Sequence, residues 1–237
     1  MLMWRAGVAL LGVLGIVEWG CSEEIAALGT TVHVAAQLAA AVVRQSTMEK
    51  RAVPQGQSEV DSLEVTSVRI LLKRLKLHTT GDTSLQGEEV KVGPFVAVFA
   101  HRERQLAVST IPPATYRRLK LEFHRLTDEE VSRYANDSLL WEFATPERYS
   151  VSIEGRVFTP AGASAFIYRS DVTANVALPL EPPAEVRKEQ VLSLLLHCDP
   201  YQIFVVAGRL VDPRDERNRR FIDSNLHMAF KVLKRTI

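Results

Sequence analysis

Three aspartates near the end of the chain have side chains that could bind a divalent cation. Asp212, Asp215 and Asp223 lie close to Asn218 and Asn225, and Ca²⁺ prefers such oxygen ligands. The spacing matches no EF-hand loop. Four arginines are interleaved with them: Arg214, Arg217, Arg219 and Arg220. Because mixed charges usually form a solvated face with local ion pairs, the sequence predicts no metal site, and the three aspartates are kept only as calcium candidates.

The other reactive side chains form no catalytic or metal-binding motif. The histidines have none of the spacings that place two imidazoles on one metal ion, and the sequence contains no HExxH, CxxC, GxxxxGK[ST] or GxGxxG pattern. GxSxG is also missing: Gly162-Ala163-Ser164 lacks the second glycine and lies in an expected hairpin turn. We therefore predict no cofactor and no catalytic residue, although a catalytic set can be scattered along a chain.

The composition is that of an ordinary globular protein with little net charge. Of 237 residues, 46% are hydrophobic and 24% are charged, and the formal net charge is +1. A nucleic-acid-binding surface needs an excess of Lys and Arg, so nucleic acid is not expected as a partner. Two cysteines are too few for a disulfide-rich scaffold.

The first residues have the features of an export signal. Arg5 is the only charge before an apolar and glycine run from Ala6 to Val17. At about 12 residues, this run is too short to span a membrane but suits a signal-peptide core. It is followed by Glu18-Trp19-Gly20-Cys21 and then by Ser22. We predict a signal peptide over residues 1–20.

The end of this signal resembles the lipobox of bacterial lipoproteins, in which the chain is cut before a cysteine that then carries lipid. The resemblance implies that Cys21 is lipidated and that a membrane is a partner through this anchor. Glu18 departs from the family, which usually has an aliphatic residue at that position. Two alternatives stay open: an uncleaved anchor, and an ordinary secretory signal that is cut within Ala35 to Ala41.

The second cysteine, Cys198, has apolar neighbours. If Cys21 is acylated, Cys198 has no disulfide partner and is expected to be a buried free thiol. A Cys21–Cys198 disulfide in an oxidising compartment is the alternative.

Residues 21–62 are interpreted as the anchor cysteine, an Ala-rich helix and a linker. Ser22 and the two acids after it are typical of a helix start, and Ala-rich sequence continues to Val43. The stretch from Arg44 to Ser62 is polar and has no periodicity, which predicts a tether between the anchor and the following domain. The helix over Val32 to Val43 could pack on the domain or on a partner.

Residues 63–237 are predicted to form one antiparallel β-sandwich domain with a C-terminal helix. Apolar residues recur at every second position, which is typical of half-buried strands. The clearest runs lie over Leu119–His124, Tyr149–Glu154, Val172–Leu180 and Leu192–Cys198. No helix separates successive strands, so the pattern favours a mainly β sandwich over a parallel α/β sheet.

Four local predictions complete this picture. Thr159 to Gly162 indicates a hairpin turn. At Ile70-Leu71-Leu72 either both faces of a strand are covered or a bulge shifts the pattern. Leu126 to Leu140 is interpreted as a loop with a short helix. After Asp212 and Pro213, apolar residues at helical spacing predict a final helix that packs on the sheet: Ile222, Leu226, Ala229 and Leu233.

Several segments in this order resemble a family of uncharacterised bacterial lipoproteins, a domain of unknown function common in Bacteroidetes-like bacteria. The segments are TSVRILLKRLKLH (66–78), VGPFVAVF (92–99), IPPATYRRLKLEFHRL (111–126), RYSVSIEGRVF (148–158) and LVDPRDERNRRFIDSNLHMAF (210–230). At Pro113-Ala114 the chain lacks a glycine that the family usually has nearby. The resemblance implies an extracytoplasmic β-sandwich on a lipid anchor. In such lipoproteins, a serine directly after the cysteine, as at Ser22, is compatible with sorting to the outer membrane. The resemblance transfers no catalytic residue.

Three functions follow as hypotheses. The first is a non-enzymatic, lipid-anchored binding or structural module of the cell envelope, with an envelope protein or a glycan as partner. The second is an extracytoplasmic hydrolase or carbohydrate-active domain with a dispersed active site. The third is a subunit of an envelope complex that docks through the Ala-rich helix. Four aromatic residues could form a platform for sugars or could pack in the core: Trp141, Tyr149, Phe166 and Tyr168.

Overall fold

The computed structural model describes residues 29–45, 59–79, 81 and 87–235. The expected signal peptide over 1–20, the lipidation site Cys21 and most of the expected linker lie outside these residues. Within them the chain is mainly β, as predicted, and its strands form two large sheets and one small ribbon. The ribbon pairs β11 (Val205–Val206) with β12 (Arg209–Leu210).

The first sheet has four strands in the order β13-β10-β1-β5. Their bounds are Phe230–Arg235 for β13, Val191–Cys198 for β10, Thr30–Leu38 for β1 and Arg104–Ile111 for β5. β1 runs parallel to β10, whereas the other ladders of both sheets in the described residues are antiparallel. This sheet is therefore mixed.

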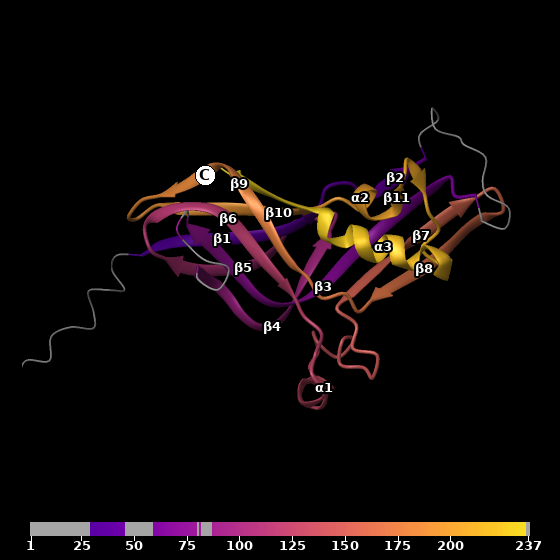
Figure 1. Ribbon diagram of the computed structural model, residues 1–237, viewed down its shortest axis with the longest axis horizontal. Coiled ribbons are helices and arrows are strands. Elements are labelled where there is room, and N and C mark those ends of the chain that lie inside the picture. Colours follow the sequence, from indigo (N-terminus) through magenta and orange to yellow (C-terminus); the bar gives the residue numbers. More distant parts are fainter. Residues whose placement is uncertain (1–28, 46–58, 80, 82–86, 236–237) are drawn as a thin grey trace, which may run out of the picture.

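The second sheet has seven strands, and β3 (Ser62–Thr79) organises it. The main path is β8-β7-β3-β6-β9, while β2 and β4 also pair with β3. The bounds are Val42–Arg44 for β2, Glu88–Ala100 for β4, Ala114–Phe123 for β6, Val151–Thr159 for β7, Gly162–Ser170 for β8 and Asn175–Val186 for β9. β7 pairs with the first half of β3 and β6 with the second half, which gives the elongated body in Figure 1.

The two sheets enclose one hydrophobic core, as a sandwich does. Side chains from β1 and β10 pack in the same cluster as side chains from β3, β6 and β7. Phe230 on β13 joins the sheets, because its ring centroid lies 5.4 Å from that of Phe99 on β4 and 5.6 Å from that of Phe123 on β6. Cys198 is a buried free thiol in this core, as predicted, and burial raises the pKa of its thiol.

Both explanations of the continuous apolar run in β3 apply. Ile70 and Leu72 face the main core, whereas Leu71 packs in a second cluster with Leu126, Leu140 and Phe143. Both faces of β3 are therefore covered at this point. The register with β4 and β6 also shifts after Leu72, so a bulge changes which residues face the core.

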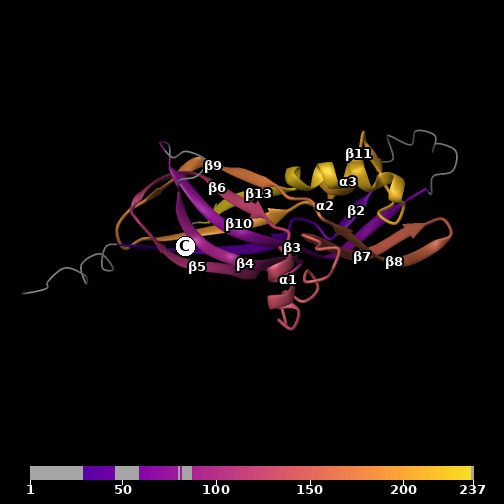
Figure 2. The same cartoon turned by 60° about the horizontal axis from the view of Figure 1, so that its bottom comes forward.

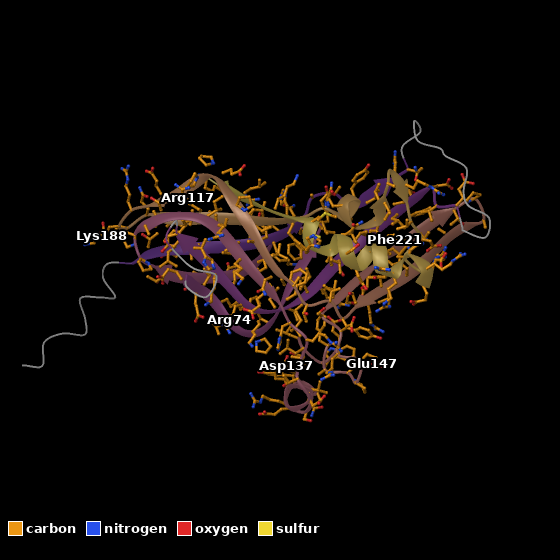
Figure 3. The ribbon with its side chains drawn as sticks, viewed as in Figure 1. Arg74, Arg117, Asp137, Glu147, Lys188 and Phe221 are labelled. Atoms are coloured by element: carbon orange, nitrogen blue, oxygen red, sulfur yellow. The ribbon has the colours of Figure 1, made fainter. Side chains whose placement is uncertain are left out.

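The second cluster is covered by an excursion between β6 and β7, which we call the α1 arm (residues 125–149). It contains α1 (Asp128–Tyr134), and this confirms the predicted loop with a short helix. Thr127 and Glu130 form a capping box at the start of α1. Figures 1 and 2 show the arm projecting from the sheets, and Figure 3 labels two of its residues, Asp137 and Glu147.

The predicted hairpin is confirmed. β7 and β8 pair from Val151 and Ser170 to Thr159 and Gly162, so the turn lies where the sequence placed it. Gly162 has φ +125°, a conformation that residues with a Cβ rarely adopt.

The predicted Ala-rich helix is wrong over residues 30–44, while its expected start at Ser22 lies outside the described residues. Residues 30–38 form β1, in which Val32, Val34 and Ala36 are fully buried, and β2 follows at Val42–Arg44. The helix propensity of alanine is worth only a few tenths of a kcal/mol per residue, whereas β1 gains ladders to two strands and a buried face. The sandwich therefore begins before residue 63, and the hypothesis of docking through a helix over Val32 to Val43 is also wrong.

The predicted C-terminal helix is confirmed in its first part and wrong in its second. A short 3-10 turn (Glu216–Asn218), α3 (Arg219–Asn225) and a second turn (Leu226–Met228) precede β13. Ile222, Leu226 and Ala229 are buried as expected, but Leu233 lies on a strand and is 45% exposed. The chain extends here because the free edge of β10 offers backbone hydrogen bonds.

One helix was not foreseen. α2 (Pro200–Phe204) follows β10 directly, and the side chain of Asp199 caps it by accepting a hydrogen bond from the Tyr201 N–H. Asp212, in contrast, caps no helix: Asp215 is the residue that caps the first 3-10 turn.

The position of β1 leads to a prediction about truncation. A chain that starts at residue 63 lacks the strand between β10 and β5, whereas a chain that starts at residue 29 retains it. We expect the longer chain to unfold in one cooperative thermal transition and the shorter chain to show none, because removing a central strand exposes the core and leaves backbone groups unpaired. Circular dichroism during heating measures this. Equal cooperative transitions in both chains would contradict the assignment of β1.

Candidate functional site

A half-open groove of about 540 Å³ lies between the α1 arm and the strands β3, β4 and β5. Its lining comes from five segments that are distant in sequence: Ala36, Arg69, Lys91, Val96, Val98, Arg104 to Leu106, and Ser138 to Glu142 without Leu140. The groove therefore exists only when the arm is folded against the sheet.

Two apolar side chains of the arm stand at this groove in contact with solvent. Leu139 is 72% exposed and Trp141 is 61% exposed. Asp137 fixes this turn: its Oδ1 accepts hydrogen bonds from the N–H of Leu139 at 2.8 Å and from that of Leu140 at 3.0 Å, and its carbonyl accepts one from the Trp141 N–H at 3.0 Å. Leu140 and Phe143 are buried against Leu71. Trp141 is therefore held outward by its neighbours.

One arginine connects the arm to the sheet. The guanidinium of Arg69 lies 2.8 Å from the carboxylate of Glu142 and also binds Glu154 on β7. Burial raises the pKa of the Glu142 carboxyl, the positive charge of Arg69 opposes this shift, and the negative charge of Glu154 adds to it. Arg69 Nε is buried and has no hydrogen-bond partner among the described residues.

Lys91 on β4 contacts the backbone of β5. Leu106 is skipped in the register of β5 with β1, because Ala107 pairs with Val34 and Gln105 with Ala35. The ammonium of Lys91 donates a hydrogen bond of 2.9 Å to the carbonyl of Leu106. The bulge therefore directs a backbone acceptor toward the lysine.

The charge of Lys91 has no opposite partner among the described residues. Its Nζ lies 4.6 Å from the ring centroid of Phe95, and burial lowers the pKa of the Lys91 ammonium. Within the described part of the chain, no carboxylate lies in ion-pair range of Lys91 or of the neighbouring Arg104. These two cations are the uncompensated charges of the groove.

The calcium candidates do not come together as a metal site. Asp212 pairs with Arg214 at 2.7 Å, and Asp215 pairs with Arg217 at 2.6 Å. Asp223 accepts a hydrogen bond of 2.6 Å from the hydroxyl of Tyr168. In residues 29–45, 59–79, 81 and 87–235, no three His, Cys, Asp or Glu side chains gather at a potential metal position.

Asp223, and Arg214 as the partner of Asp212, instead attach the C-terminal segment to β8. The hydroxyl of Tyr168 donates to the carbonyl of Arg219 at 3.2 Å as well as to Asp223. Burial and then the hydrogen bond and charge of Asp223 raise the pKa of Tyr168, while the positive charge of Arg219 opposes this shift. The hydrogen bond and charge of Arg217 lower the pKa of Asp215. The hydrogen bonds and ion pairs of the three aspartates therefore stabilise the C-terminal segment.

Of the four aromatic residues considered for a sugar platform, Trp141 alone is exposed. Phe166 and Tyr168 are buried in the main core, and Tyr149 packs against the second cluster. Sequence patterns did not reveal Lys91, Arg104 or Arg69 as site residues, because they come from separate strands and form no local motif. The turn at Asp137 has a local signal, because an Asp side chain commonly accepts from backbone N–H groups two or three residues later.

A second hollow, of about 390 Å³, lies over β6 and β9. It is lined by Thr79, Arg117, Arg118, Ala177 and Pro179. It contains cationic side chains but no aromatic ring and no residue of the α1 arm. We therefore regard the groove at Trp141 as the better candidate for a ligand site.

Comparisons with protein-family models, with curated protein sequences and with solved structures found no match to this chain. The resemblance to bacterial lipoproteins therefore stays a prediction. None of the helices in the described segments has the length and apolar character needed to cross a membrane.

The raised pKa of Glu142 predicts a pH dependence of stability. Because the fold raises this pKa above its ordinary value of 4.5, the protonated form is favoured in the folded state. Its contribution to stability is present below pH 4.5 and is lost as the pH rises through the folded pKa. Glutamine imitates the protonated carboxyl. We expect the free energy of unfolding of the unmodified chain, minus that of Glu142→Gln, to fall as the pH rises from about 4 to 7.

Urea denaturation at several pH values measures this difference. Glu147→Gln is the matched control, since Glu147 is an exposed carboxylate on the same arm. A difference for Glu142→Gln that stays constant, or that rises with pH, would contradict the assignment.

Proposed function

We propose that this protein is a non-enzymatic binding module of the bacterial cell envelope, and that the groove at the α1 arm binds its ligand. The observation that carries the proposal is the exposed ring of Trp141, which lines the same groove as two cations that have no ion-pair partner among the described residues. Exposing an aromatic ring and leaving charges unpaired bring no stability to the folded chain. Both are typical of surfaces that contact a partner.

We further propose that the chain is exported and held in the outer membrane by lipid on Cys21. This is supported by the apolar run before Gly20 and by the position of the cysteine directly after it. The sandwich described above begins at Thr30, only a short stretch of chain after this cysteine. An envelope protein or a glycan would then be within reach of the groove.

The anchor is tested by the intact mass of the mature protein. Expression of the full chain in a bacterium should yield a species that starts at Cys21 and carries acyl chains, because the signal would be cut before the lipidated cysteine. Cys21→Ala should abolish this species. A mass without lipid, or a chain that starts elsewhere, would refute the anchor and leave the proposal for the groove untouched.

Ligand binding is tested by the fluorescence of Trp141. The sequence has 3 tryptophans, and Trp4 and Trp19 precede the proposed cleavage site, so the emission of the mature chain comes from Trp141. Oligosaccharides, short peptides and phospholipid vesicles are added in turn. We expect one of these classes to change the emission in a saturable way. By calorimetry, Trp141→Ala should weaken binding of that ligand about tenfold or more.

Phe221→Ala is the matched control, because Phe221 is also an exposed aromatic residue (50%) and lies on α3, away from the α1 arm (Figure 3). It should leave the affinity unchanged. Failure of all three ligand classes, or binding that is insensitive to Trp141→Ala, would refute the groove as the ligand site.

A hydrolase or carbohydrate-active domain is the second candidate, and the raised pKa of Glu142 in the groove favours it. It is second because Glu142 is tied to Arg69, which also binds Glu154. A general acid must instead be free to give its proton to the substrate. Hydrolysis of a saccharide by the unmodified chain, abolished by Glu142→Gln, would favour this function over the first.

A further inference from the structure

We propose that the ligand of the groove is an acidic saccharide, with one sugar ring packed on Trp141 and an anionic group held by Lys91 and Arg104. This inference rests on the proposed function, since it names the ligand class of the same groove. It is carried by three features of the groove: its charge, its aromatic side chain, and strand edges that are protected from the addition of a further strand.

The charge of the groove favours an anion. Three cations line it, Arg69, Lys91 and Arg104, against one carboxylate, Glu142. Arg69 is compensated by Glu142 and Glu154. Lys91 and Arg104 have no acid in ion-pair range within the described ranges. A partly buried ammonium without a counter-charge is costly, and an anionic ligand would remove that cost.

The aromatic side chain favours a sugar ring. A pyranose has an apolar C–H face that packs on an indole and a rim of hydroxyls that needs hydrogen-bond partners. Around Trp141 the groove presents such partners in Ser138, Gln105 and Glu142. The lining joins Trp141 and several aliphatic side chains to an equal number of polar or charged residues. This mixture matches a sugar better than an acyl chain, which needs a lining that is apolar throughout.

The strand edges argue against a peptide that adds to the sheet. Among the described strands, β4 pairs only with β3 and β5 only with β1, so each has one edge without a ladder, and residues of both strands line the groove. The carbonyl of Leu106 is already occupied by Lys91, and Pro94 in β4 has no N–H to donate. Such features protect an edge from strand addition. Recognition must therefore come from side chains.

The test is isothermal titration calorimetry with the mature chain and four probes of equal length. A galacturonate tetramer carries carboxylates, a sulfated galactose tetramer carries sulfates, a glucose tetramer is neutral, and tetraglutamate is an acidic peptide. We expect at least one acidic saccharide to bind about tenfold or more tightly than both the neutral saccharide and the peptide. The comparison of the two acidic saccharides identifies the anion. Added salt should weaken this binding.

Variants separate the two parts of the site. Trp141→Ala and Lys91→Met should each weaken binding of the acidic saccharide about tenfold or more. Arg104→Gln changes an exposed cation of the groove and keeps the test valid if Lys91→Met fails to fold. Lys188→Met is the matched control, because Lys188 is an exposed lysine at one end of the body, distant from the α1 arm (Figure 3). It should leave the affinity unchanged.

The failure of this inference can be distinguished from failure of the proposed function. Equal or tighter binding of the neutral saccharide or of tetraglutamate, lost in Trp141→Ala, would overturn the acidic saccharide and leave the groove as the ligand site. Absence of binding by every probe would also overturn the acidic saccharide. If in addition no peptide, saccharide or vesicle changes the emission of Trp141, both proposals fail.

Discussion

The pairing of β3 with four neighbours is the constraint on which the rest of the structure depends. β2, β4, β6 and β7 are all hydrogen-bonded to this one strand of 18 residues, and β8 and β9 follow through β7 and β6. A strand with sheet on both sides and a core beneath it has few ways to move. A slip of one residue would turn every buried side chain of β3 to the wrong face.

The candidate site is a consequence of the second face of β3. Leu71 points away from the main core and needs an apolar cover, which Leu140 and Phe143 of the α1 arm provide. Burying these two residues turns Leu139 and Trp141 outward, over the strand that carries Arg69. The interaction of Arg69 with Glu142 then attaches the arm to the sheet. Trp141 is thus exposed because its neighbours Leu140 and Phe143 are buried against Leu71. The charges around the groove, in contrast, decide which ligand it can bind.

Two sets of charged residues in this chain differ in whether the fold gives them a partner of opposite charge. The acids and arginines near the C-terminal end pair with one another, as Asp212 does with Arg214 and Asp215 with Arg217, and so contribute to the structure. Lys91 and Arg104 lack such partners in the described residues, although the net charge of the whole chain is only +1. A near-neutral composition therefore says little about local charge, because the fold decides which cations meet which acids.

Local order in the sequence determined those features that need only neighbouring residues: the hairpin at Thr159–Gly162, the alternation of the strands, the short helix of the arm and the buried Cys198. Tertiary structure decided the rest. Alanine favours a helix by a few tenths of a kcal/mol, and the place of residues 30–38 between β10 and β5 outweighed that preference. The helical spacing of apolar residues predicted a helix beyond Phe230, but the chain forms β13 there because the edge of β10 offers backbone hydrogen bonds. Lys91, Arg104 and Trp141 form one groove because separate strands and the arm converge there, and no spacing within one segment can encode a contact between segments that only the folded core brings together.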